Sequence, residues 1–280
     1  MAIISEIAKK SGLTTEPVAI VWSNTKPEDA LEIRPGTWAC LMWYYAKAAL
    51  DGKVTALSRN SFGCSGGAMG IGFGRPFEKH SSGNEENFCC FLSNGREGSK
   101  DTDAYDAHLN RITNPHQREM LEKGERIKKN PSVAKGFLNA LPFYDVPTEY
   151  VLIKPLSSTD PDEMIKSVIF LVNPDQLSVL SILANYHRGQ ITDGVVVAAG
   201  AAGCQAIGVC TYNEEHSDNP RAIVGLTDLM ARKSVRKTLG SDKLTFSVPY
   251  SLFLEMESNV PGSILESELW IELRDEAKNQ

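Results

Sequence analysis

The sequence predicts an α/β or α+β fold in which mixed sheets with flanking helices form two similar halves. Short apolar runs, which are typical of buried strands, alternate along the chain with longer stretches of helical character. A glycine-rich segment that carries a cysteine occurs twice, with the two cysteines 140 residues apart. The 280 residues are 42% hydrophobic and 23% charged, which is ordinary for a globular protein with a large buried core.

The first half of the chain predicts a helix at residues 3–15 and then a strand at Pro17–Trp22, whose unbroken apolar run suits burial on both faces. A second helix is expected over residues 38–50, with Thr37 as its cap and Cys40 in its first turn. The later elements are, in order, strands at Val54–Leu57 and Phe88–Leu92, helices within residues 101–140 that break near Asn114 and Asn130, and a strand at Tyr150–Leu156.

The second half of the chain repeats this alternation. Its strands are expected at Ser167–Val172, Val195–Ala199, Ala222–Leu226 and Leu244–Val248. Its helices are expected at Gln176–Tyr186, after the opening motif Asn-Pro-Asp-Gln, at Asp228–Leu239, which is basic, and from Pro249 to Glu257.

Two glycine-rich segments are the most informative part of the sequence. Asn60–Gly74, N-S-F-G-C-S-G-G-A-M-G-I-G-F-G, contains six glycines, and each interior glycine costs a helix about 1 kcal/mol, so we expect no stable helix there. Such a backbone can instead bring its N–H groups close to a ligand, beside the thiol of Cys64. Ala199–Cys210, A-G-A-A-G-C-Q-A-I-G-V-C, places Cys204 in the same way. We call these the first and second Gly–Cys segments.

The two segments belong to a larger internal similarity. Pro17 and Ser167 begin apolar runs that are each followed by proline, acid and a helix, and then by glycine, a strand and a Gly–Cys segment. We interpret this as a duplication with half-repeats at about 1–150 and 151–280, which form a single pseudo-symmetric domain. If the two halves are related by an approximate two-fold axis, Cys64 and Cys204 face one shared cavity.

Several motifs occur in a fairly specific order across nearly the whole chain. They are P-V-A-I-V near the start, the helix with Cys40, F-G-C-S-G-G and G-A-A-G-C-Q-A-I-G in the Gly–Cys segments, and the late runs V-G-L-T-D-L-M-A-R-K and L-T-F-S-V-P-Y. In this order they resemble an uncharacterised prokaryotic family, domain of unknown function number 169. The resemblance implies a soluble protein, common in archaea and anaerobic bacteria, with cysteines at these loop positions, and it carries no catalytic residues over to this chain.

Three functions fit these observations, and the sequence does not decide whether the protein is an enzyme. The first is a small-molecule or cofactor site between the Gly–Cys segments, built from Cys64, Cys204, Gly63, Gly66, Gly67 and Gly203. The second is a thiolate-bound metal or an iron–sulfur cluster in anaerobic redox metabolism, held by Cys64, Cys204 and Cys40, with Cys90 and Cys210 as further ligands. The third is a non-catalytic binding or regulatory subunit in which the glycines serve close packing.

Charge and motif spacing argue against other classes of protein. A net charge of −6 disfavours nonspecific nucleic-acid binding, so the basic residues between Arg232 and Lys237 are expected to form a solvated face. No apolar run is long enough to span a membrane, and we expect a cytoplasmic protein without disulfides, with a homodimer as the expectation from base rates. The glycine spacing fits neither a dinucleotide fingerprint nor a P-loop, although a looser anion nest assisted by Arg75 or Arg232 remains open.

Overall fold

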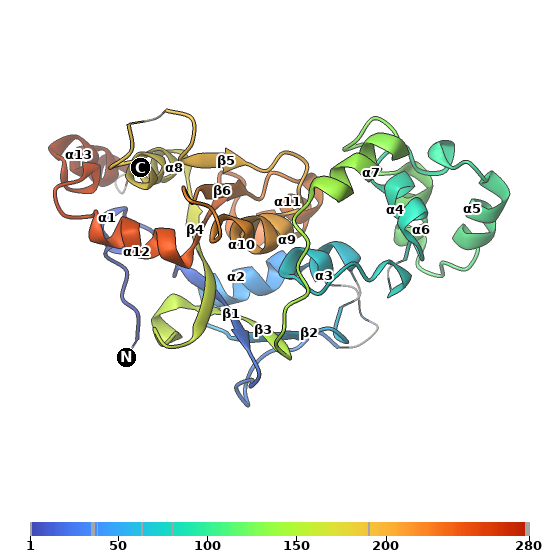
Figure 1. The fold of residues 1–280 in the computed structure, drawn as a ribbon, viewed down its shortest axis with the longest axis horizontal. Coiled ribbons are helices and arrows are strands. Elements are labelled where there is room, and N and C mark those ends of the chain that lie inside the picture. The colour runs from blue at the N-terminus through green and yellow to red at the C-terminus, as the bar shows by residue number, and fades with distance from the viewer. Residues whose placement is uncertain are drawn as a thin grey trace.

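The protein is built on one seven-stranded sheet (Figure 1). The computed structural model describes residues 2–34, 37, 39–62, 64–79, 81–189 and 191–277. The strand order is β2-β3-β1-β4-β7-β6-β5, in which β5 and β6 pair in parallel and the other neighbours pair antiparallel. The strands are β1 (Val18–Ser23), β2 (Thr55–Ser58), β3 (Tyr150–Pro155), β4 (Met164–Val172), β5 (Val195–Val197), β6 (Ala222–Gly225) and β7 (Leu244–Pro249). The predicted α/β class is therefore confirmed.

Helices cover both faces of this sheet, which explains why β1 is apolar on both sides. The first face carries α2 (Leu41–Asp51), α3 (Ser65–Ile71), the segment α9 (Gly203–Gln205), η4 (Ala206–Cys210) and α10 (Thr211–Glu214), and α11 (Leu229–Leu239). The second face carries α1 (Glu6–Lys10), α8 (Pro174–Ala184), α12 (Tyr250–Ser258) and α13 (Glu268–Ala277). Of the helices that the structure describes, none is long and apolar enough to cross a membrane.

Residues 77–141 form a helical insertion that projects from one end of the sheet (Figure 1). It contains α4 (Glu85–Phe91), α5 (Thr102–Leu109), α6 (Pro115–Lys123) and α7 (Pro131–Ala140), which surround a separate apolar core. Its two connections to the sheet domain run side by side, since Gly74 N–H donates to the Tyr144 carbonyl (3.0 Å) and Val146 N–H donates to the Gly72 carbonyl (2.8 Å). The breaks expected at Asn114 and Asn130 are correct, because each asparagine caps the helix that follows it.

Two predicted elements are wrong. The segment Phe88–Leu92 is expected to be a strand but lies largely in helix α4, whose start is set by the Asn84 side chain accepting from the Asn87 amide and by two acids in the first turn. The first Gly–Cys segment is expected to avoid helix, yet it contains α3. A short helix draws its stability mainly from tertiary packing, and α3 is packed against the second Gly–Cys segment.

Two helix starts differ from expectation. The first helix covers only Glu6–Lys10, and the second begins at Leu41 with Cys40 as its N-cap residue. Thr37 does not cap it, because its hydroxyl donates to the Arg34 carbonyl. Trp38, with which the second helix is expected to begin, lies outside the described residues.

The structure does not confirm the internal duplication. A two-fold axis that exchanges the adjacent antiparallel strands β1 and β4 would place the helices after them on the same face of the sheet. Instead α2, which follows β1, packs on the first face, and α8, which follows β4, packs on the second face. The two Gly–Cys segments do share the first face, and they are in contact there.

Candidate functional site

The two Gly–Cys segments pack backbone to backbone. The thiol of Cys204 donates to the carbonyl of Gly66, with an S–O distance of 3.3 Å. A methyl group on Gly70 would lie 2.8 Å from the carbonyl carbon of Cys204, and one on Gly208 would overlap the carbonyl oxygen of Gly70. Glycine at positions 70 and 208 is therefore required for the approach that brings Cys204 beside the first segment.

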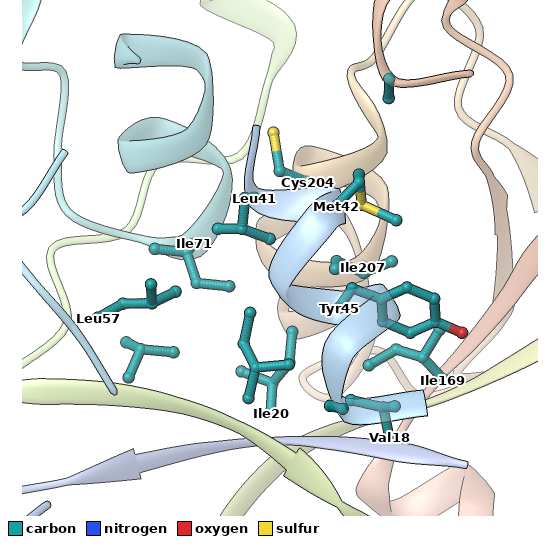
Figure 2. Close-up of a cluster of buried hydrophobic side chains, with 14 of the residues drawn as sticks. Val18, Ile20, Leu41, Met42, Tyr45, Leu57, Ile71, Ile169, Cys204 and Ile207 are labelled. Atoms are coloured by element: carbon teal, nitrogen blue, oxygen red, sulfur yellow. The ribbon is translucent and has the colours of Figure 1, made fainter. Parts of the chain in front are cut away.

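Three cysteines gather where these segments meet. Cys40 is the N-cap residue of α2, Cys64 is the N-cap residue of α3, and Cys204 lies in α9. Cys64 and Cys204 both lie beside Gly66, because a methyl group on Gly66 would lie 3.7 Å from the Cys64 sulfur and the Cys204 thiol donates to the Gly66 carbonyl. Cys40 acts electrostatically on both of these thiols, which places it in the same region. The start of α2 reaches this region because Gly203 packs on Met42, whose Cγ would lie 3.1 Å from a methyl group on that glycine. Cys204 belongs to the buried apolar cluster on the first face of the sheet, and Figure 2 shows its sulfur pointing away from Ile20 and Val18 of the same cluster.

Two carboxylates join the three thiols, and sequence reasoning missed both as site residues. Asp228 is the N-cap of α11 and accepts hydrogen bonds from the Ala231 amide and the Gly203 amide, each at 2.6 Å. It acts electrostatically on Cys40 and Cys204. Glu125, from the helical insertion, acts on Cys64, and the charge of Asp228 acts on Glu125. An aspartate before a helix is a recognisable cap, whereas no sequence signal marks Glu125.

We call Cys40, Cys64, Cys204, Asp228 and Glu125 the thiol–carboxylate cluster. Burial raises the pKa of the Cys64 thiol to about 11 and also raises the pKa of Cys40 and Cys204. The amides of Gly67 and Gly66 favour the thiolate of Cys64, without forming a capping hydrogen bond, and they offset only part of this effect. At neutral pH these thiols are protonated, unlike activated cysteine nucleophiles, whose pKa is lowered.

Glu125 makes the free energy of unfolding depend on pH. Burial, and next the charge of Asp228, raises its pKa from 4.5 to about 7. The folded state therefore binds the Glu125 proton more tightly than the unfolded chain does. The stability that this proton contributes is lost as pH rises from about 4.5 to 7. We expect Glu125→Gln to increase the free energy of unfolding at pH 8 by about 1–2 kcal/mol and to change it little at pH 4.5, as measured by urea denaturation.

The control for this prediction is Glu122→Gln, which changes an exposed glutamate on α6. It should leave the free energy of unfolding unchanged at both pH 8 and pH 4.5. A Glu125→Gln variant with the same stability difference at both pH values would contradict the assignment.

The remaining predicted site residues are distributed as follows. Gly66 and Gly67 lie in the first turn of α3, and Gly203 opens α9, whereas Gly63 lies outside the described residues. Cys90 is buried in the core of the insertion, and Cys210 ends the π-helical segment η4, so neither belongs to the cluster.

The two arginines considered for an anion nest are engaged with backbone carbonyls. Arg75 donates to the Leu138 carbonyl (2.8 Å), at the base of the insertion. Arg232 donates to the carbonyls of Leu226 (3.2 Å), Lys243 (3.1 Å) and Ser241 (2.6 Å).

Two hollows lie beside the Gly–Cys segments and in the insertion. A hollow of about 10 Å³, room for about one water molecule, lies beside the Gly–Cys segments and is lined in part by Met69, Arg75 and Gln205. A larger hollow of about 310 Å³ lies in the insertion between α4 and α5. Neither is lined by a cluster residue. Within the described part of the chain, no three His, Cys, Asp or Glu side chains are already arranged to hold one metal ion.

The fold and the site define an α/β protein with a helical insertion and a cluster of free thiols at helix starts. A family model described as uncharacterised ArCR, the DUF169 family, matches residues 6–259. The chain belongs to this family, and the resemblance seen in the sequence motifs is thereby confirmed. A search of curated proteins and a search of solved structures each gave no match.

Proposed function

We propose that the protein binds a small molecule or cofactor where its two Gly–Cys segments meet, with the thiol–carboxylate cluster facing the ligand. The observation that carries this proposal is the convergence of Cys40, Cys64 and Cys204, which lie up to 164 residues apart in the chain. Cys40 and Cys64 are less buried as residues than Cys204, although burial raises the pKa of all three thiols.

Packing alone accounts for some of the site but not for the cysteines. Close contact between α3 and the second segment explains glycine at positions 70 and 208. It does not call for a thiol at the start of α2, at the start of α3 and in α9. These features favour a ligand over the alternative of a subunit whose glycines serve packing only.

A local irregularity in the helix after Cys204 also supports the proposal. Residues Ala206–Cys210 form a π-helical segment, in which Gly208 departs from helical backbone angles. Such segments are rare and occur often at functional sites. Here the π-helical segment begins two residues after Cys204.

The proposal predicts that the purified protein retains a ligand. After anaerobic purification, native mass spectrometry of the wild type should show a bound mass that disappears on denaturation, and alkylation of Cys64 should be slower before the ligand is removed than after. Cys64→Ser and Cys204→Ser should lose the bound mass, and the matched control Cys210→Ser, in the same segment but outside the cluster, should keep it. A wild type without bound mass, and with the same alkylation rate before and after denaturation and refolding, would contradict the proposal.

A further inference from the structure

The helical insertion is packed as a body of its own beside the sheet domain (Figure 1). Its helices make their main contacts with one another, since α4 packs on both α6 and α7 and α5 packs on α6. They surround a separate apolar core that contains Phe88, Tyr105 and Leu138. Bodies with separate cores move relative to each other unless a large apolar interface joins them. The insertion is therefore built to change its position as a unit.

Both connections of the insertion are anchored to the sheet domain. On the first connection, the Ser65 hydroxyl of α3 donates to the Pro76 carbonyl (3.0 Å). On the second, the Tyr144 ring packs edge-on against two aromatic rings of the sheet domain, with centroid distances of 6.4 and 5.6 Å. Bending is therefore confined to residues 76–77 and 141–143, which lie between these anchors and the insertion. We call these residues the hinge, since a few loop residues are enough to absorb such a movement.

The insertion touches the second Gly–Cys segment close to its start. A methyl group on Gly200 would lie 2.9 Å from Nζ of Lys128 and 3.8 Å from the ring carbon Cε2 of Phe137. The same Nζ lies 4.2 Å from the centroid of the Phe137 ring, so the two side chains form one contact surface. Gly200 precedes Cys204 by four residues. Movement of the insertion away from the sheet domain would break this contact near Cys204.

Exposed apolar side chains lie near this contact in both bodies. Val133 is one helical turn before Phe137 on the same face of α7, and it is 47% exposed. Leu229 is 79% exposed at the start of α11, directly after Asp228, whose carboxylate accepts from the Gly203 amide. A movement that extends the contact along α7 would remove apolar surface from water, which favours the closed arrangement.

We propose that the helical insertion is a lid, which moves about the hinge and covers or uncovers the place where the two Gly–Cys segments meet. This inference rests on the proposed function, because it describes how a ligand enters and leaves that site. Cys204 is buried, so a ligand reaches it only after such a movement. In the closed position Lys128 and Phe137 lie against Gly200, and in the open position this contact is lost and Cys64 and Cys204 meet solvent. Lids of this kind exclude water and retain a bound ligand.

Lys128→Ala tests the lid in the ligand-free full chain, because it shortens a half-buried side chain of the closed contact. We expect alkylation of Cys64 and Cys204 to become about fourfold faster, the change that follows when opening exposes one buried methylene group fewer. Alkylation of Cys90, in the core of the insertion, should stay unchanged, because the lid moves without unfolding. Lys129→Ala, which changes the exposed neighbour, is the matched control and should leave all these rates at their wild-type values.

Hydrogen exchange followed by mass spectrometry checks that the insertion moves as one body. In Lys128→Ala, the amides of residues 199–203 should exchange faster than in the wild type. Those of α4, inside the insertion, and of β4, inside the sheet, should exchange at unchanged rates. Faster exchange throughout α4 would show local unfolding of the insertion and would contradict the lid.

The outcomes separate the lid from the proposed function. Alkylation of Cys64 and Cys204 that Lys128→Ala leaves unchanged, or a Cys90 that speeds up together with them, overturns the lid. If the purified protein then still retains a bound mass, the proposed function stands without the lid. If the lid responds as expected but the protein holds no bound mass and Cys64 is not protected, the proposed function is overturned and the lid remains.

Discussion

Gly208→Ala is expected to destabilise the protein by about 3 kcal/mol or more. The added methyl group would overlap the Gly70 carbonyl oxygen and lie 3.3 Å from the Cα of Ile71. Both are backbone atoms of α3 and cannot move aside as a flexible side chain would. The second Gly–Cys segment must therefore shift away from α3, which also moves Cys204 away from Cys64. Urea denaturation measures the loss of stability, and faster alkylation of Cys204 in the native state measures its exposure.

Gly136→Ala is the matched control, because Gly136 lies inside helix α7, is exposed, and has no atom within 4 Å of an added methyl group. Alanine is the better helix former, so this substitution should stabilise the protein by up to about 1 kcal/mol. If Gly208→Ala had an effect as small as that of the control, the backbone contact between the two Gly–Cys segments would be wrong.

The strands were largely predictable because their signal is local. In Val18–Val21 every side chain is buried, and an unbroken apolar run shows this without knowledge of the neighbouring strands. The helix α3 was not predictable, because its glycines are unfavourable in an isolated helix and become useful only against Cys204 and Gly208. The apolar run Phe88–Leu92 looked like a strand because burial in a helical core and burial in a sheet give the same pattern over five residues.

The candidate site was predictable only where its residues carry a local sequence signal. Cys64 and Cys204 stand out beside glycine in two similar segments, and Cys40 stands out at a helix start. Their convergence depends on contacts of α2, α3 and α9 that the sequence does not encode locally. Glu125 belongs to the cluster because it comes near Asp228, which is more than 100 positions further along the chain, so no neighbouring residue marks it.

Asp228→Ala is also expected to lower the free energy of unfolding, by about 3 kcal/mol. Its carboxylate caps α11 through the Ala231 amide and also accepts from the Gly203 amide, at the start of α9. Loss of a cap costs about 1 kcal/mol, and leaving the buried Gly203 amide without its acceptor costs a further 1–3 kcal/mol. The substitution should also speed alkylation of Cys204, since Asp228 fixes the segment that carries this thiol.

Asp101→Ala separates these two contributions. Asp101 caps α5 through the Ala104 amide at 2.9 Å, and among the described residues its carboxylate bonds to no second element. Its removal should therefore cost only about 1 kcal/mol and leave Cys204 reactivity unchanged. The difference in lost unfolding free energy between Asp228→Ala and Asp101→Ala measures how much the hydrogen bond from the Gly203 amide to Asp228 contributes to stability. If both variants lost the same stability, Asp228 would be an ordinary helix cap, and the start of α9 would be positioned by the contact of Gly203 with Met42 instead.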